Sequence, residues 1–89
     1  MKKIVLITTK GCEGCNIMNN LILESLNALN VSIEFCRKDI TDCNADFLNK
    51  HDINDLPATL LFVNGVLHQK IIGTRSKFKI LLTLTKTFN

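Results

Sequence analysis

The chain has 89 residues, of which 46% are hydrophobic and 21% charged, with one proline and four glycines. This composition excludes a disordered or fibrous chain, and the length supports a single core, so we expect one domain over residues 1–89. The net charge of +3 is uneven, because residues 1–55 carry six basic and eight acidic residues, whereas residues 56–89 carry five basic residues and no acid. We interpret the basic segment as a solvated helix face and expect no nucleic-acid partner, because its phenylalanines fit a core.

The first apolar run is short. It covers four residues, from Ile4 to Ile7, whereas a secretory signal needs roughly 7 to 15 apolar residues and a membrane span about 18. We therefore expect a cytoplasmic protein with no membrane partner. We also expect a monomer. In a reducing cytosol, four cysteines are more often catalytic or buried than part of a structural disulfide framework.

The first part of the chain predicts a strand, a helix and a second strand. The continuously apolar run Lys3–Thr8 is typical of a central strand buried on both faces. From Cys12 to about Asn30, apolar residues at spacings of three and four predict one face of an amphipathic helix: Ile17, Met18, Leu21, Ile22, Leu26 and Leu29. Val31–Phe35 alternates, which favours a second strand with one exposed face or an edge position. Together these elements predict a right-handed crossover with parallel pairing.

A short helix and a hairpin follow. Ala45–His51 is expected to be a helix with two residues facing inward, Phe47 and Leu48. Ala58–Val63 and Val66–Ile72 flank Asn64-Gly65, the two-residue turn most typical of an antiparallel hairpin.

The chain is expected to end in a helix over about Lys77–Phe88, capped by Thr74 or Ser76. Its expected buried stripe is formed by Phe78, Leu81, Leu82 and Phe88. The resulting order β-α-β-α-β-β-α predicts an α/β fold, a four-stranded mixed sheet covered by helices on both faces.

Two cysteines separated by two residues lie at the junction between the first predicted strand and the first predicted helix. In the segment Cys12-Glu13-Gly14-Cys15 the two sulfurs lie on one face of the first helical turn, close enough to bond, which predicts a redox pair. Cys12 is expected to be the exposed partner. The helix N-terminus and Lys10 favour its thiolate, and Glu13 opposes it.

A zinc site is the alternative for this motif, but a second pair at matching spacing is missing, since Cys36 and Cys43 are six residues apart. We therefore expect no metal. Cys36 and Cys43 are expected to be structural or incidental, and a regulatory disulfide between them is the alternative.

These residues resemble the thioredoxin family over nearly the whole chain. Cys12 to Cys15 is similar to its active-site motif, Leu56 to Gly65 to its proline-strand-Asn-Gly hairpin, and Ile72-Gly73 to the glycine that closes its substrate groove. The resemblance implies the thioredoxin fold, Cys12 and Cys15 as catalytic residues, and a cis Pro57 that faces them. It also implies a substrate-binding surface that contains Gly11, Glu13, Gly14, Leu56, Pro57 and Gly73.

The chain departs from the family at several of these positions. Gly11 stands where a tryptophan is usual, and Leu6 stands where many thioredoxins carry a buried acid that helps to move a proton from the second cysteine. Thr74 follows Gly73, so the Gly-Gly pair of the glutaredoxins is missing too. The Thr-Val-Pro with which glutaredoxins help to hold glutathione is missing as well. The absence of these glutaredoxin features favours a compact thioredoxin-like protein over a glutathione-dependent one.

The expected activity is thiol-disulfide exchange, in which Cys12 attacks a protein disulfide and Cys15 resolves the mixed disulfide. The resemblance implies a flavoprotein thioredoxin reductase as electron donor, with glutathione as the other candidate, and no cofactor bound to this chain. The alternatives are a non-catalytic adaptor that binds a partner beside Pro57, a glutaredoxin-type enzyme and a metal-binding module.

Overall fold

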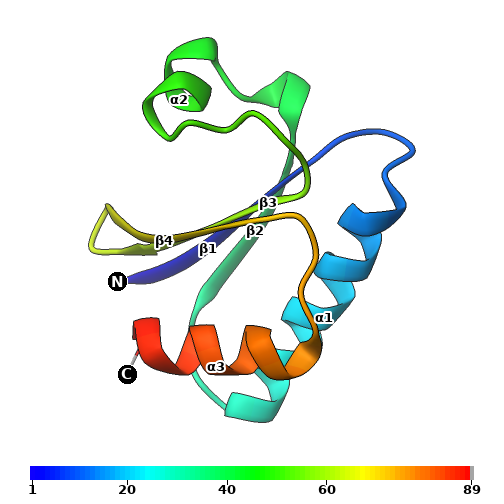
Figure 1. The fold of residues 1–89 in the computed structure, drawn as a ribbon. Coiled ribbons are helices and arrows are strands. Elements are labelled where there is room, and N and C mark those ends of the chain that lie inside the picture. Colours follow the sequence, from blue (N-terminus) through cyan, green and yellow to red (C-terminus); the bar gives the residue numbers. More distant parts are fainter. Residues whose placement is uncertain (89) are drawn as a thin grey trace.

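The computed structural model describes residues 1–88 and contains one four-stranded sheet with helices on both faces (Figure 1). Its elements are β1 (Lys2–Thr8), α1 (Glu13–Leu29), β2 (Glu34–Asp39), η1 (Ile40–Asp42), α2 (Ala45–Lys50), β3 (Ala58–Val63), β4 (Val66–Ile72) and α3 (Lys77–Phe88). The strand order is β2-β1-β3-β4, with β1 parallel to β2 and antiparallel to β3. The predicted fold class and order of elements are confirmed.

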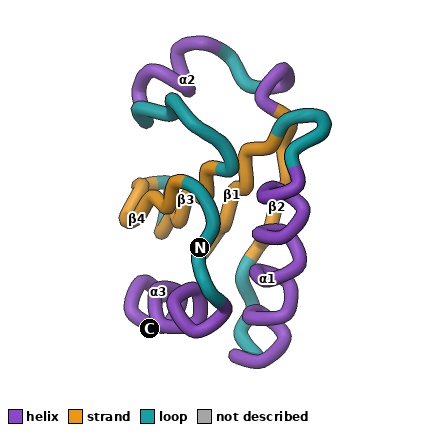
Figure 2. The backbone as a smooth tube through the Cα atoms, turned by 45° about the vertical axis from the view of Figure 1, so that its right-hand side comes forward, coloured by secondary structure: helices purple, strands orange, loops and turns teal. Residues whose placement is uncertain are grey.

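β1 is central, and its side chains alternate between two apolar clusters. Ile4 and Leu6 pack with residues of α1 and α3, whereas Val5 and Ile7 lie on the opposite face with a residue of α2. Figure 2 shows α1 and α3 on one side of the sheet and α2 on the other. Both faces of the strand are therefore removed from water, which explains why its sequence is a continuous apolar run and does not alternate.

α1 begins and ends at residues suited to helix termini. Cys12 is its N-cap, and the chain leaves the helix at Asn30, which is left-handed with φ of 52° and donates its N–H to the carbonyl of Leu26. Met18 and Ile22 are fully buried, as expected, but Ile17 is 46% exposed. Ile17 was therefore wrongly assigned to the buried face, which continues at Ser25.

β2 begins later than the alternation predicted. Residues 31–33 are a connection, and the strand runs from Glu34 to Asp39 as an edge of the sheet, in register with β1 from Lys3–Glu34 to Thr8–Asp39. The edge position is confirmed and the predicted strand boundaries are wrong. The register brings the carboxyl ends of β1 and β2 to the same end of the sheet, where the loop to α1 also begins.

α3 has the predicted boundaries, and the Lys79 amide donates to Ser76 Oγ at 3.3 Å, so Ser76 is the capping residue. Its buried face is formed by Ile80, Leu84 and Phe88, at intervals of four. Phe78 is 70% exposed and Leu82 is 38% exposed, so the predicted stripe was wrong at both positions.

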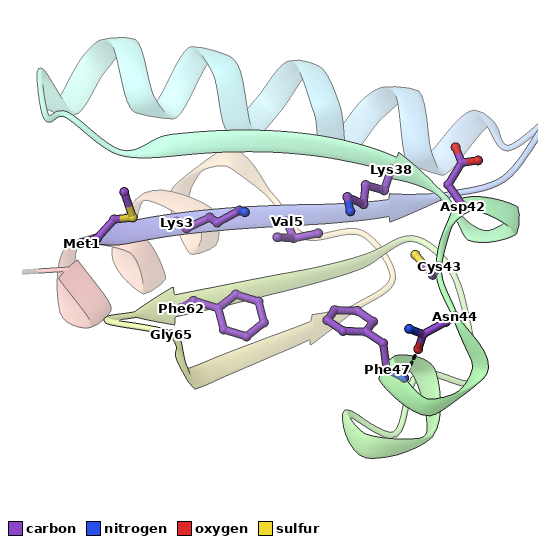
Figure 3. A pocket seen from close by; sticks show the side chains of 10 residues that line it. All are labelled: Met1, Lys3, Val5, Lys38, Asp42, Cys43, Asn44, Phe47, Phe62 and Gly65. Carbon is purple, nitrogen blue, oxygen red and sulfur yellow. Dashed lines mark hydrogen bonds between the residues drawn. The ribbon is translucent and has the colours of Figure 1, made fainter.

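The face of the sheet that carries α2 is only partly covered, because α2 has six residues. A hollow of about 410 Å³ remains there, and Figure 3 shows Val5 and Phe62 from the sheet and Phe47 from α2 lining it, with Lys3 and Lys38 also beside it. No residue of the CxxC motif or of the Pro57 segment lines this hollow. No helix in the described part of the chain is long and apolar enough to cross a bilayer.

Candidate active site

Cys12 and Cys15 form a disulfide at the N-terminus of α1, with their Cα atoms 5.2 Å apart. The amide of Cys15 donates a hydrogen bond to Cys12 Sγ at 3.0 Å. Cys15 is fully buried, whereas Cys12 is half-buried. A reactant that approaches from solvent therefore meets Cys12 first, and the helix amides beside its sulfur favour negative charge there.

Pro57 lies against the other side of the motif. A Cβ placed on Gly14 would be 3.6 Å from Pro57 Cδ and 3.3 Å from Thr74 Cγ2, so these two side chains border the first turn of α1. The Leu56–Pro57 peptide bond is cis, as the resemblance implied. Gly73 has φ of +84° and donates its N–H to the carbonyl of Pro57 at 2.8 Å. This left-handed conformation explains why glycine occupies the position.

The backbone amide directly before Pro57 is not free. The amide of Leu56, a residue of the expected substrate-binding surface, donates to Asp55 Oδ1 at 2.9 Å and so already has a partner. A substrate that pairs with this amide has to displace the Asp55 carboxylate.

A second hollow, of about 460 Å³, adjoins Cys12 on the side of β2. It is lined by Thr8, Thr9, Lys10, Gly11, Cys12, Asn16, Arg37 and Asp39. Arg37 reaches across the end of the sheet, because its Nη2 donates to Asn16 Oδ1 at 2.9 Å and its Nε to Thr8 Oγ1 at 3.4 Å. Asp39 Oδ2 accepts bonds from the amide and hydroxyl of Thr41, and these bonds, aided by Lys10, lower the pKa of the Asp39 carboxyl.

The other two cysteines are free and half-buried. Burial raises the pKa of the Cys43 thiol, which disfavours its reactive thiolate form. Within residues 1–88, no three His, Cys, Asp or Glu side chains gather as a metal site requires. Leu6, where the resemblance places a buried acid, is fully buried among apolar residues.

The structure thus brings most of the sequence-predicted site residues together. Gly11 adjoins Cys12 in the loop, Glu13 is the exposed first residue of α1, and Gly14 lies beside Pro57. Sequence reasoning missed Arg37. The available signal was Asn16, which lies four residues after Cys12 and so on the same side of the helix, and whose Oδ1 accepts the hydrogen bond from Arg37. Arg37 belongs to β2, whose register the sequence pattern did not predict.

Solved structures share this architecture. Thioredoxin-2 of the malaria parasite, described as a component of the parasite's protein secretion machinery, aligns with a TM-score of 0.80 and 15% identity over 97% of this chain and 82% of its own. Thioredoxin O2 from Arabidopsis thaliana in its oxidized state aligns with a TM-score of 0.80 and 18% identity over 100% of this chain and 76% of its own. No protein-family model matches the sequence, and no curated protein matches it either.

The chain therefore has the thioredoxin fold. Within that fold it carries a CxxC disulfide, whose first cysteine is accessible and whose second cysteine is buried.

Proposed function

We propose that the chain is a thiol-disulfide oxidoreductase whose Cys12/Cys15 couple reduces the disulfides of protein substrates. The observation that carries the proposal is the disulfide at the start of α1, with Cys15 fully buried and Cys12 accessible. Ordered roles in thiol-disulfide exchange need this asymmetry, because the attacking sulfur must be accessible to the substrate and the resolving sulfur must lie next to it.

In the reduced protein the Cys12 thiolate attacks one sulfur of the substrate's disulfide. A mixed disulfide forms between Cys12 and the substrate, and the other substrate sulfur leaves as a thiolate and takes up a proton. The Cys15 thiol then loses its proton and attacks Cys12 Sγ, which releases the second substrate thiolate, protonated in its turn. Two electrons pass to the substrate, and the Cys12–Cys15 disulfide remains.

The surroundings of the pair support the first step. The Cys15 amide, 3.0 Å from Cys12 Sγ, is positioned to donate to the thiolate, and hydrogen bonds to a charged form favour that form. Pro57 and Thr74, which border Gly14, supply one wall along which an extended substrate can lie beside the disulfide.

Reduction of the Cys12–Cys15 disulfide requires an external donor of two electrons. We propose a flavoprotein thioredoxin reductase or glutathione for this step, and the exchange itself needs no cofactor in this chain. A cytoplasmic location fits the proposal, because that compartment keeps thiols reduced. Comparing turnover with each donor identifies the partner.

The test is an insulin-type disulfide reduction assay combined with trapping. We expect the wild-type protein to turn over and both Cys12→Ser and Cys15→Ser to fall to background. Cys15→Ser should accumulate a mixed disulfide with substrate, visible by intact mass, because the resolving thiol is gone. Cys12→Ser should trap nothing, because Cys15 is buried.

Other outcomes lead to other functions. Equal trapping by both variants, or trapping by neither together with no turnover, would overturn the assigned roles and favour an adaptor that binds beside Pro57. Stoichiometric zinc in the purified protein would favour a metal-binding module.

A further inference from the structure

The hollow beside Cys12 carries more positive than negative charge. Of its eight lining residues, Lys10 and Arg37 are basic and Asp39 alone is acidic. The hydrogen bonds from Thr41, aided by Lys10, lower the pKa of the Asp39 carboxyl, so the charges of Lys10 and Asp39 offset each other, whereas no salt bridge of Arg37 is found within residues 1–88. The hollow therefore holds an unbalanced positive charge next to the reactive sulfur.

Arg37 is held in place and still has donors to offer. Its bonds to Asn16 and Thr8 use two of the five N–H groups of the guanidinium, which leaves three without a partner among residues 1–88. The guanidinium is thus oriented by two elements, the end of β1 and the first turn of α1, before any ligand arrives. Pre-orientation lowers the entropic cost of binding an anion.

The position of this hollow relative to the disulfide is informative. Pro57 and Thr74 border the motif at Gly14, whereas Lys10 and Arg37 share a hollow with Cys12 that neither Pro57 nor Thr74 lines. A substrate whose sulfur reaches Cys12 therefore has the cationic hollow beside its neighbouring groups. A guanidinium with free N–H groups binds planar anions such as carboxylates through paired hydrogen bonds.

We propose that Lys10 and Arg37 select substrates with a carboxylate next to the disulfide. The inference rests on the proposed oxidoreductase function and adds a substrate class to it. The carboxylate can come from an acidic residue of a protein substrate or from glutathione. The experiment below separates these two sources.

The readout is a ratio of kcat/KM values for paired substrates. The first pair consists of two disulfide peptides that differ only in Glu or Gln beside the cysteine. The second pair consists of glutathione disulfide and its neutral ester. The variants are Arg37→Gln and, as matched control, Lys38→Gln, which removes the same charge from the next residue of β2. Lys38 lines the hollow on the opposite face of the sheet.

We expect the wild-type protein to prefer the charged member of at least one pair by about threefold to fivefold, the upper range for an exposed ion pair. The preference should fall with added salt, fall in Arg37→Gln, where Lys10 alone remains, and persist unchanged in Lys38→Gln. The pair that shows this behaviour names the source of the carboxylate. Using a ratio cancels any effect of Arg37 on the reactivity of Cys12 itself.

No preference in either pair, or an equal loss of preference in Lys38→Gln, would overturn the inference, because the charge would then act without a defined site. Reduction of the neutral Gln peptide by the wild-type protein tests the proposed function separately. Failure there overturns the oxidoreductase itself, whereas efficient reduction without a preference overturns the carboxylate site alone.

Discussion

Thr59 is a polar side chain inside the apolar core. It is 1% exposed, lies opposite Leu6 in the pairing of β3 with β1, and its Oγ1 has no hydrogen-bond partner within residues 1–88. A buried hydroxyl without a partner loses its bonds to water on folding and gains nothing in exchange. Thr59 therefore lowers the stability of the fold relative to an apolar residue of the same shape.

Thr59→Val should raise the free energy of unfolding by about 1 kcal/mol, because valine has the same shape and no group to desolvate. Urea unfolding followed by circular dichroism measures it. Thr8→Val is the matched control, because Thr8 is also buried but contacts Arg37 and the carbonyl of Lys38. It should lower stability. If Thr59→Val destabilised the protein as much as Thr8→Val, the hydroxyl of Thr59 would have a partner.

Among the elements, those specified by local chemistry were predicted best. The hairpin β3-β4 follows from Asn64-Gly65, and both residues have the positive φ that this turn requires, 52° and 82°. The start of α1 and the CxxC pair were predicted because the cap and the spacing lie within a few residues of each other.

Elements decided by distant packing were predicted less well. α3 has apolar residues around most of its circumference, so periodicity allowed two faces, and packing with α1 and the sheet selected Ile80 and Leu84 over Phe78 and Leu82. The start of β2 depends on how many residues the connection between the end of α1 and the sheet requires. Because the predicted strand ended at Phe35, sequence reasoning did not place Arg37 in β2 beside Leu6 of β1.

The segment that leads into β3 bears on substrate pairing, since Asp55 occupies the amide of Leu56. Asp55→Ala should free this amide and lower the KM for an extended peptide disulfide about two- to fivefold, the value of one modest hydrogen bond. Asp55→Asn keeps an acceptor at the same place and should resemble the wild type. Steady-state kinetics of all three proteins decide it, and an unchanged or higher KM in Asp55→Ala would show that substrates do not use this amide.

α2 packs on the sheet through an aromatic group that contains a titratable residue. The His51 ring meets Phe47 edge-on at 4.7 Å and Phe62 at 5.6 Å between centroids. Burial, together with the nearby charges of Lys50 and Lys70, lowers the pKa of His51 below its usual 6.5. The folded state therefore prefers the neutral ring.

This shift gives stability a defined pH dependence. As the pH falls below 6.5, the unfolded chain takes up a proton at His51 before the folded chain does. The stability that the neutral His51 ring contributes is therefore fully present above pH 6.5 and is lost as the pH falls through the folded pKa. We expect the urea midpoint to decrease between pH 7 and pH 5.5. His51→Phe keeps the aromatic contacts without titrating and should flatten the profile. An equally steep decrease in His51→Phe would assign the pH dependence to other groups.

At the scale of the whole molecule, the two faces of the sheet differ. α1 and α3 complete one core, whereas the six-residue α2 covers the other face only in part (Figure 2). The CxxC pair begins α1 on the better-packed face, and Cys15 is fully buried there. A change in the redox state of the pair is therefore expected to change the free energy of unfolding of the entire domain.

The oxidised protein should be more stable than the reduced protein, but only by up to about 2 kcal/mol. Closing so short a loop removes about that much entropy from the unfolded chain. The helix N-terminus and the Cys15 amide offset part of it, because they stabilise the thiolate of the reduced folded state. Because stability and redox equilibrium are linked, each 1.4 kcal/mol of this difference lowers the reduction potential of the folded pair by about 30 mV relative to the unfolded chain.

Urea unfolding with and without a dithiol reductant measures the difference, and the Cys12→Ser/Cys15→Ser double variant is the control. That variant should show no effect of reductant, because Cys36 and Cys43 are both free. A residual effect would reveal a disulfide between them. A reduced protein more stable than the oxidised one would make the pair an oxidant of substrates, because the fold would then drive electrons into the pair, and the direction of electron flow proposed above would be reversed.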